Sequence, residues 1–340
     1  MKFFSTLRLS LCLVFCAGQS PAAFINGHSY LPLADWAGAN GLRLARMGRS
    51  DEFVVTNRST RLVFEKDSST AQINGVNVAL CFPVAVDKGD VLIAQLDLSQ
   101  TVDPLIFPPK ISAKKITTIC LDPGHGGKDT GEHFEAHNEK TCTLALALEL
   151  SGQLKRAGFK VILTRNKDTF VELPARPAIA NKAVADLFIS LHFNATPTGR
   201  SEVAGPETYC ITPVGAASSN AQGEGADHGA TAANRVGQKS LLLAYQVQKS
   251  LVKNLGTEDR SVRRARFAVL RDAAMPAILI EGGYMSHPVE GRKIFNAAYR
   301  KQMAAAMVNG ILAYQKLTAP PPPKQNPGGM NKVSSAKKLK

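Results

Sequence analysis

Residues 118–128, TICLDPGHGGK, decide the fold class of this chain. The stretch opens with an apolar run typical of a buried parallel strand, and the run stops at Asp122-Pro123-Gly124. His125 follows, between Gly124 and two further glycines. A strand that ends in such a turn places the imidazole at the carboxyl edge of a sheet, where open α/β sheets bind ligands. The glycines permit unusual backbone angles and a close approach of ligand to backbone.

The segments around this stretch continue an α/β pattern. Apolar periodicity predicts helices at 138–157, 173–185, 240–255 and 293–314. Short apolar runs predict strands at 160–164, 187–191, 207–212, 268–270 and 277–280. The Gly/Ala/Ser/Asn-rich stretch at 214–235 has no periodicity and predicts a loop. We therefore expect an open, mostly parallel sheet flanked by helices over residues 116–316.

Residues 24–110 predict a separate, small β-rich domain before the α/β domain. Short strands are expected at 53–56, 61–64, 71–74 and 76–79, and Asn74-Gly75 is a strong signal for a hairpin turn between the last two. The stretches NGHSYLPLADWAGANGL and INGVNVAL resemble the stalk-like module at the N-terminus of copper amine oxidases. Prolines at 104, 108 and 109 mark the linker to the α/β domain.

The two ends of the chain differ in composition from its middle. Residues 1–23 combine Lys2 and Arg8 with a short apolar core and small residues, as in a secretory signal peptide. Cys16 leaves a lipoprotein signal open as an alternative to a cleaved one. Residues 317–340 are proline-rich and then basic, which predicts a disordered tail. No further apolar run is long enough to span a membrane.

The excess of basic residues suggests an anionic partner or a strongly solvated surface. Lys and Arg number 41 against 27 Asp and Glu, a formal net charge of +14. No nucleic-acid-binding motif accompanies this excess, so a polyanionic substrate or a solvated surface is favoured over nucleic acid. Removal of residues 1–23 leaves four cysteines, whose pairing the sequence does not decide: Cys81, Cys120, Cys142 and Cys210. Of these, we expect Cys120 and Cys142 to be buried thiols.

Three expected strands each end in a residue that can bind metal or protons. His125, His192 and Glu281 follow TICLD, LFISL and AILI, and Glu139 lies in the first turn of the helix after the His125 loop. Two imidazoles and a carboxylate with one open position are typical of catalytic zinc. A further carboxylate can serve as general acid and base. Each residue alone has a structural explanation, but four of them at one sheet edge favour an active site.

The order of motifs carries a family resemblance. The segments LDPGHGGKDTG, NEK, LTRNKD, LPARPAIAN, ADLFISLHFNA and FAVLRDAAMPAILIEGGYMSH resemble the zinc-dependent N-acetylmuramoyl-L-alanine amidases of the amidase_3 family over residues 116–314. The resemblance implies one zinc ion held by His125, Glu139 and His192. It also implies Glu281 as the catalytic residue and a substrate-binding role for Arg176 and Asn194. His133 and His137 depart from the family pattern, and we interpret them as exposed loop residues.

The resemblance implies hydrolysis of the amide bond between N-acetylmuramic acid and L-alanine in peptidoglycan, for cell-wall turnover or daughter-cell separation. Together with the signal peptide at residues 1–23, it implies a secreted or periplasmic, wall-associated protein. The missing nucleic-acid motifs predict no nucleic-acid partner. We expect a monomer, and the resemblance leaves room for an activator protein. Two alternatives stay open: another secreted zinc peptidase acting on stem peptides, and a non-catalytic wall-binding protein.

Overall fold

The computed structural model describes residues 22–47, 51–108, 115–220 and 229–319. The predicted signal peptide, except for its last two residues, lies outside this range, as do most of the linker and the tail from residue 320. The last helix continues to Thr318, slightly beyond the expected start of the tail. Within the described residues, no helix is both long and apolar enough to cross a membrane.

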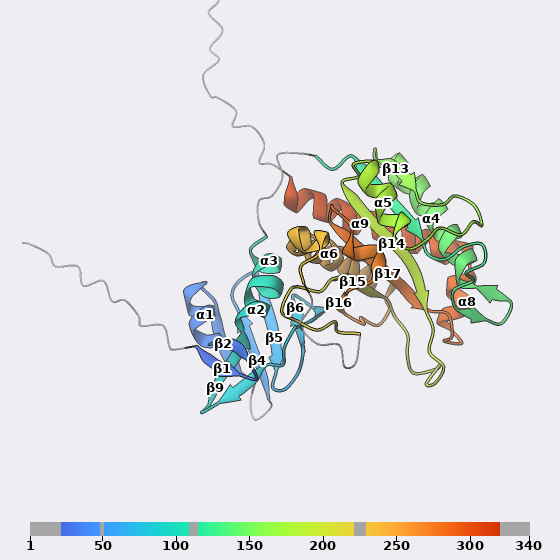
Figure 1. Ribbon diagram of the computed structural model, residues 1–340. Coiled ribbons are helices and arrows are strands. Elements are labelled where there is room, and N and C mark those ends of the chain that lie inside the picture. The colour runs from blue at the N-terminus through green and yellow to red at the C-terminus, as the bar shows by residue number, and fades with distance from the viewer. Residues whose placement is uncertain (1–21, 48–50, 109–114, 221–228, 320–340) are drawn as a thin grey trace, which may run out of the picture.

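A single large sheet runs through the molecule (Figure 1). Its eleven strands have the order β13-β10-β14-β17-β15-β16-β7-β6-β5-β4-β3. The first six of these belong to the α/β part: β13 (Lys160–Leu163), β10 (Thr118–Pro123), β14 (Leu187–Asn194), β17 (Ala277–Tyr284), β15 (Glu207–Ile211) and β16 (Val262–Ala265). The other five belong to the N-terminal part: β7 (Val76–Ala79), β6 (Thr70–Ile73), β5 (Arg61–Glu65), β4 (Glu52–Thr56) and β3 (Arg43–Arg46).

The sheet is mixed, so the expectation of a mostly parallel sheet is wrong. Strands β13, β10, β14 and β17 are mutually parallel, but β15 pairs with β17 antiparallel. The N-terminal strands β3 to β7 form successive antiparallel pairs, as hairpin connections require. They join the α/β part through the parallel pair Val262↔Val78. The β-rich region is therefore present, but it extends the same sheet.

The remaining N-terminal elements cover one end of this sheet. A second sheet of four strands contains β1 (Ala23–Ile25), β2 (His28–Pro32), β9 (Asp90–Ala94) and β8 (Ala85–Asp87). The helical elements are α1 (Leu33–Ala39), α2 (Gln95–Asp97), η1 (Leu98–Val102) and α3 (Asp103–Ile106). The predicted hairpin is confirmed, because Asn74 and Gly75 adopt φ angles of 47° and 83° between β6 and β7. The resemblance to the copper amine oxidase module stays a prediction.

Helices cover the two faces of the α/β sheet unequally. The long helices α4 (Glu139–Arg156), α6 (Gly237–Leu255) and α9 (Ala297–Thr318) share a buried apolar core with one face. A smaller core on the other face includes residues of α5 (Ala175–Lys182) and α7 (Ala268–Arg271). The other elements are β11 (His133–Phe134), β12 (His137–Asn138), the 3₁₀ helix η2 (Ala232–Val236) and α8 (Glu290–Phe295).

The predicted elements of the α/β part are mostly confirmed. The segment expected as a strand at 268–270 is instead helix α7, because so short an apolar run does not distinguish the two. Strand β16, VRRA, was not predicted, because its two arginines break the apolar run. The four described cysteines are all free thiols, and Cys120 and Cys142 are buried as expected.

Arg264 of β16 fastens the N-terminal elements to the α/β part. Its side chain is only 3 % exposed. One terminal nitrogen, Nη2, donates to the carbonyl oxygen of Gln100 at 2.6 Å and to the hydroxyl of Thr101 at 3.2 Å. The other, Nη1, donates to the carbonyl oxygen of Ile211 at 3.4 Å. The guanidinium thus bridges η1 and β15, and its loss would leave these acceptors buried without a donor.

We therefore expect Arg264→Ala to lower the free energy of unfolding by about 3 kcal/mol, since several buried acceptors lose their donor. Urea denaturation followed by circular dichroism measures this change. The matched control is Arg271→Ala at an exposed position, for which the expected change is within about 0.5 kcal/mol. Equal stabilities of the two variants would contradict the bridging role.

Candidate active site

The loop after β10 holds His125 in an uncommon backbone conformation. Its φ angle is 61°, in the left-handed region that residues with a side chain seldom adopt. Two buried arginines hold the loop from below: Arg176 donates to the carbonyl oxygen of His125 at 2.9 Å, and Arg165 to that of Gly124 at 2.7 Å. The loop is therefore fixed by its hydrogen bonds, and the imidazole projects from a defined position.

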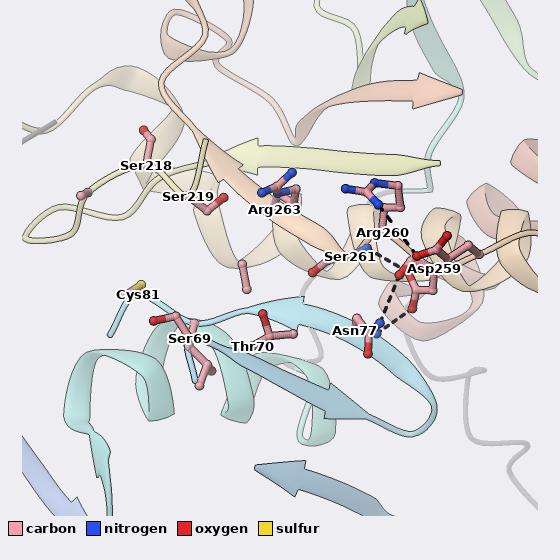
Figure 2. A pocket seen from close by; sticks show the side chains of 14 residues that line it. Ser69, Thr70, Asn77, Cys81, Ser218, Ser219, Asp259, Arg260, Ser261 and Arg263 are labelled. Carbon is pink, nitrogen blue, oxygen red and sulfur yellow. Dashed lines mark hydrogen bonds and ion pairs between the residues drawn. The ribbon is translucent and has the colours of Figure 1, made fainter. Parts of the chain in front are cut away.

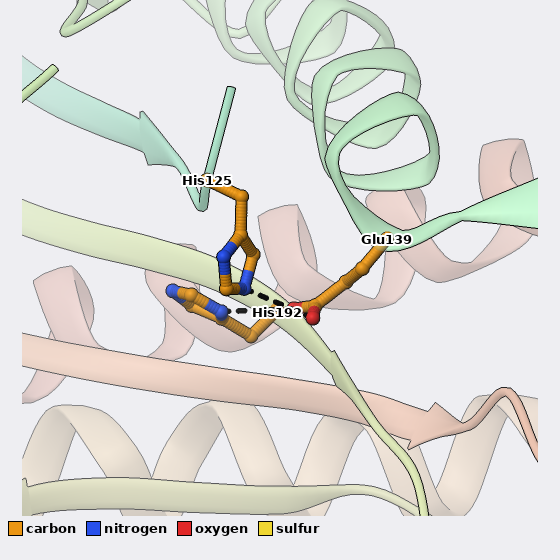
Figure 3. A group of neighbouring side chains, drawn as sticks. All are labelled: His125, Glu139 and His192. Atoms are coloured by element: carbon orange, nitrogen blue, oxygen red, sulfur yellow. Dashed lines mark hydrogen bonds and ion pairs between the residues drawn. The ribbon is translucent and has the colours of Figure 1, made fainter. Parts of the chain in front are cut away.

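His125, Glu139 and His192 converge at the edge of the sheet (Figure 3). They come from the loop after β10, the first turn of α4 and strand β14. Nε2 of His125 lies 2.9 Å from Oε2 of Glu139, and Nδ1 of His192 lies 2.9 Å from Oε1 of the same carboxylate. One potential ligand atom from each residue lies within 4.8 Å of the others. The predicted trio is thus brought together.

Two glycines make room for this cluster. A Cβ atom on Gly124 would lie 2.3 Å from the ring of His192, nearer than any side-chain carbon can approach. A Cβ atom on Gly131, whose φ is +63°, would lie 2.6 Å from both Oε2 of Glu139 and the ring of His125. Alanine at either position would therefore displace the side chains that form the cluster.

Further groups orient the cluster and set its charge. Asp129 lies 3.0 Å from Nδ1 of His125, and the backbone N–H groups of Glu132 and Phe193 donate to Glu139. Burial would raise the pKa of Glu139, but hydrogen bonds to both imidazoles outweigh it and hold that pKa far below its usual value. Burial would lower the pKa of His125, but Glu139 and Asp129 together raise it. The cluster therefore keeps a charged carboxylate between two imidazoles.

Glu281 lies next to this cluster on the neighbouring strand. It pairs with His192 in the β14–β17 register, so the two side chains share one face of the sheet. Both line a cavity of about 310 Å³, together with Asn194 and Glu139. Oε2 of Glu281 is buried and has no hydrogen-bond partner in the described structure. Burial, and then the charge of Glu139, raise the pKa of Glu281 well above its usual value.

The chemistry of these residues fits a zinc ion. Two imidazole nitrogens and a carboxylate oxygen are the donor set of catalytic zinc sites that keep an open position. His125 also contacts Asp129, as metal-binding histidines commonly contact a carboxylate through their other nitrogen. Glu281, whose Oε2 is buried and unpartnered, lines the same cavity as the three donors, so a positive charge there would offset the isolation of this carboxylate.

Arg176 lies elsewhere than its predicted role requires. It is 1 % exposed, pairs with Asp122 at 2.9 Å and donates to the carbonyl oxygens of Val171, Pro123 and His125. This location under the loop does not fit contact with a substrate, and it instead lets Arg176 position His125. Asn194 does line the cavity, as its predicted role requires.

The two additional histidines are exposed and lie outside the cluster, as expected. His137 stacks on Phe295, with the ring centroids 3.8 Å apart. Asp129 was not predicted as part of the site, although it stands inside the GHGGKD motif four residues after His125. Glu207 was not predicted either. It is a buried carboxylate of β15 that pairs with Glu281 in the β15–β17 register, and no sequence pattern indicates it.

Comparison with known proteins assigns the α/β part of the chain to one family. Residues 119–313 match the Amidase_3 family, described as N-acetylmuramoyl-L-alanine amidase. The chain belongs to the Amidase_3 family. The match spans the strands and loops that carry every residue of the cluster, and it leaves out the N-terminal strands.

Individual Amidase_3 proteins show how far the similarity reaches. N-acetylmuramoyl-L-alanine amidase AmiC of Escherichia coli O6:H1 is 30% identical over 316 residues, covering 80% of this chain and 74% of that protein. LytC of Bacillus subtilis is 34% identical over 58% of this chain, which spans only 36% of LytC. The crystal structure of an amidase from Clostridium difficile 630 shares 32% identity at a TM-score of 0.50, over 60% of this chain and 98% of that one.

Protons compete with metal for this cluster, because a histidine ligand must be neutral. The raised pKa of His125 means that the metal-free protein keeps its proton to a higher pH than a free histidine does. We therefore expect the Zn²⁺ affinity to be highest and constant at pH values above the pKa of His125. Below that pKa, the affinity should fall by up to about tenfold per pH unit. Competition with a coloured chelator from roughly pH 5.5 to 8 measures this, in the range where histidine titrates.

Asp129→Asn supplies the internal check on this pH dependence. Because Asp129 helps to raise the pKa of His125, its replacement should move the midpoint of zinc release to lower pH. Asp272→Asn, at an exposed position on α7's C-terminal side, should leave the midpoint unchanged. A midpoint that is identical in all three proteins would show that His125 does not control the competition.

Proposed function

We propose that this chain is a zinc-dependent N-acetylmuramoyl-L-alanine amidase that hydrolyses peptidoglycan between the lactyl group of N-acetylmuramic acid and the L-alanine of the stem peptide. The observation that carries the proposal is the cluster of His125, Glu139 and His192 beside the unpartnered carboxylate of Glu281. Membership of the Amidase_3 family supports our assignment of the bond that is hydrolysed. A secreted or periplasmic location, where peptidoglycan is accessible, follows from this substrate.

Each residue has a distinct part in the proposed reaction. His125, Glu139 and His192 would hold one zinc ion, which supplies a Lewis acid at the scissile carbonyl and lowers the pKa of water. Glu281 accepts the proton of the attacking water at its carboxylate and returns it to the departing alanine nitrogen. Its raised pKa suits this exchange, since burial makes the Glu281 carboxylate a stronger proton acceptor than an exposed glutamate.

The surrounding residues position the His125 imidazole and the substrate. Asp129 orients the imidazole of His125, and Arg176 fixes the backbone of the same residue. Asn194 lines the cavity together with His192 and Glu281, where its amide can hydrogen-bond a substrate amide. Leu173 and Phe267 line the same cavity and make part of its wall apolar.

Glu281→Gln tests the assignment most simply. The amide cannot accept the water proton, so we expect turnover of peptidoglycan to fall by about 10³-fold while zinc content stays at one ion per chain. Mass spectrometry of the digest should show free stem peptides with the wild-type protein. The matched control is Glu132→Gln, the same substitution at another residue of the cavity, and its activity should stay within a few-fold.

The same digest separates the alternatives. Shortened stem peptides that remain attached to glycan would indicate a zinc peptidase. Intact peptidoglycan, with the protein bound to it, would indicate a wall-binding protein. If Glu281→Gln hydrolysed peptidoglycan at the wild-type rate, Glu281 would not be the proton acceptor.

A further inference from the structure

A second cavity lies where the N-terminal strands meet the α/β part (Figure 2). Its volume is about 520 Å³. One wall comes from the N-terminal strands β6 and β7 and the residue before β6, and includes Ser69, Thr70 and Asn77. The facing wall comes from β16 and the segment before it, and includes Ser261 and Arg263. Neither part of the chain encloses this space alone.

The second cavity shares a face of the sheet with Glu281. Glu207 of β15 pairs with Glu281, and Tyr209 of β15 pairs with Arg263 of β16. Paired residues, and residues two apart along one strand, lie on the same face. Glu281 and Arg263 therefore face the same side, separated by two strand spacings and by two residues along the strand, or about 12 Å. The next strand, β7, adds Asn77 to this face, since Val78 pairs with Val262.

The lining offers hydrogen-bonding groups that the protein does not use. Ser69 and Thr70 are exposed, and their hydroxyl groups have no hydrogen-bond partner among the described residues. The side-chain nitrogen of Asn77 donates to the backbone carbonyl of Asp259 at 3.1 Å, and its oxygen stays available as an acceptor. Such a wall of small hydroxyl and amide groups suits a ligand rich in hydroxyl and amide groups of its own.

Charge excludes a strongly ionic ligand. Arg260 and Arg263 both pair with the buried carboxylate of Glu207, at 3.1 and 3.0 Å. Asp259 accepts hydrogen bonds from the backbone of Asn77 and from the side chain of Gln248. The lining thus carries two acidic and two basic side chains, Glu258 and Asp259 against Arg260 and Arg263, with no surplus of either sign. A carboxylate-rich stem peptide would find no unmatched cation here, whereas a neutral sugar needs none.

We propose that this cavity is a glycan subsite, which binds a sugar unit of the same peptidoglycan strand whose muramoyl amide lies at Glu281. The inference rests on the proposed amidase function and extends it. A separation of about 12 Å along one sheet face is spanned by two to three sugar units of a glycan chain. The N-terminal strands supply half of the subsite, so they select polymeric glycan over isolated muramoyl peptides.

Thr70→Trp and Ser69→Trp test the subsite, because each fills the cavity from an exposed position. On peptide-bearing glycan oligomers we expect an unchanged kcat and a KM raised by about tenfold, as the loss of one or two hydrogen bonds predicts. On a single N-acetylmuramoyl peptide, which does not reach the cavity, both constants should equal those of the wild type. Ser59→Trp, the same change at an exposed position outside the cavity, is the matched control and should behave as wild type on both substrates.

Binding measured without turnover separates this proposal from the amidase function itself. Calorimetric titration of zinc-loaded protein with peptide-free glycan oligomers should show binding to the wild type and to Ser59→Trp, and at least tenfold weaker binding to Thr70→Trp. A protein that binds these oligomers but cleaves no substrate would refute the amidase and retain the subsite. Equal KM and equal glycan binding in all variants would overturn the subsite. A KM that depends on the length of the stem peptide, and not on the length of the glycan, would overturn it as well.

Discussion

One buried carboxylate, that of Glu139, joins the parts of this site. It lies 2.9 Å from a nitrogen of each imidazole, one on the loop after β10 and one on strand β14. Burial alone would raise its pKa, but hydrogen bonds to the two imidazoles lower that pKa and keep the carboxylate charged. Two backbone N–H groups also donate to it. Its position in the first turn of α4 adds the favourable field of a helix N-terminus. The rest of the α/β part serves to bring His125 and His192 to this charge.

A second buried carboxylate, that of Asp122, holds together the strands that carry His125 and His192. Asp122, fully buried at the end of β10, accepts hydrogen bonds from Thr164, Ser190 and Arg176 at 2.6, 2.8 and 2.9 Å. A buried ion pair is costly unless its remaining atoms are satisfied, and here both carboxylate oxygens and the guanidinium have partners. This network connects β10, β14 and the segment after β13, so it fixes the edge of the sheet on which the cluster stands.

Those parts of the fold and of the site that follow from local sequence patterns could be predicted from the sequence. Apolar runs with abrupt polar ends revealed β10, β14 and β17, and with them His125, His192 and Glu281, because parallel strands end at one edge. The roles of Asp122, Arg176 and Glu207 depend on contacts between distant segments, which periodicity does not report. Arg176 was consequently expected to meet substrate, although it lies under the His125 loop. The mixed sheet escaped prediction for the same reason. Strand β15 pairs antiparallel with β17, and β7 joins the antiparallel N-terminal strands to β16; both pairings connect segments far apart in the chain.

We propose that water attacks the lactyl carbonyl of the muramoyl amide, at the cavity lined by Glu281. Digestion of peptidoglycan in ¹⁸O-labelled water, followed by mass spectrometry of the separated glycan and peptide products, tests the position of this attack directly. We predict one ¹⁸O atom in the lactyl carboxylate of muramic acid, and an unlabelled stem peptide with a free amino group on its L-alanine. Label in a carboxyl group of the peptide, with the lactyl group still amidated, would contradict it.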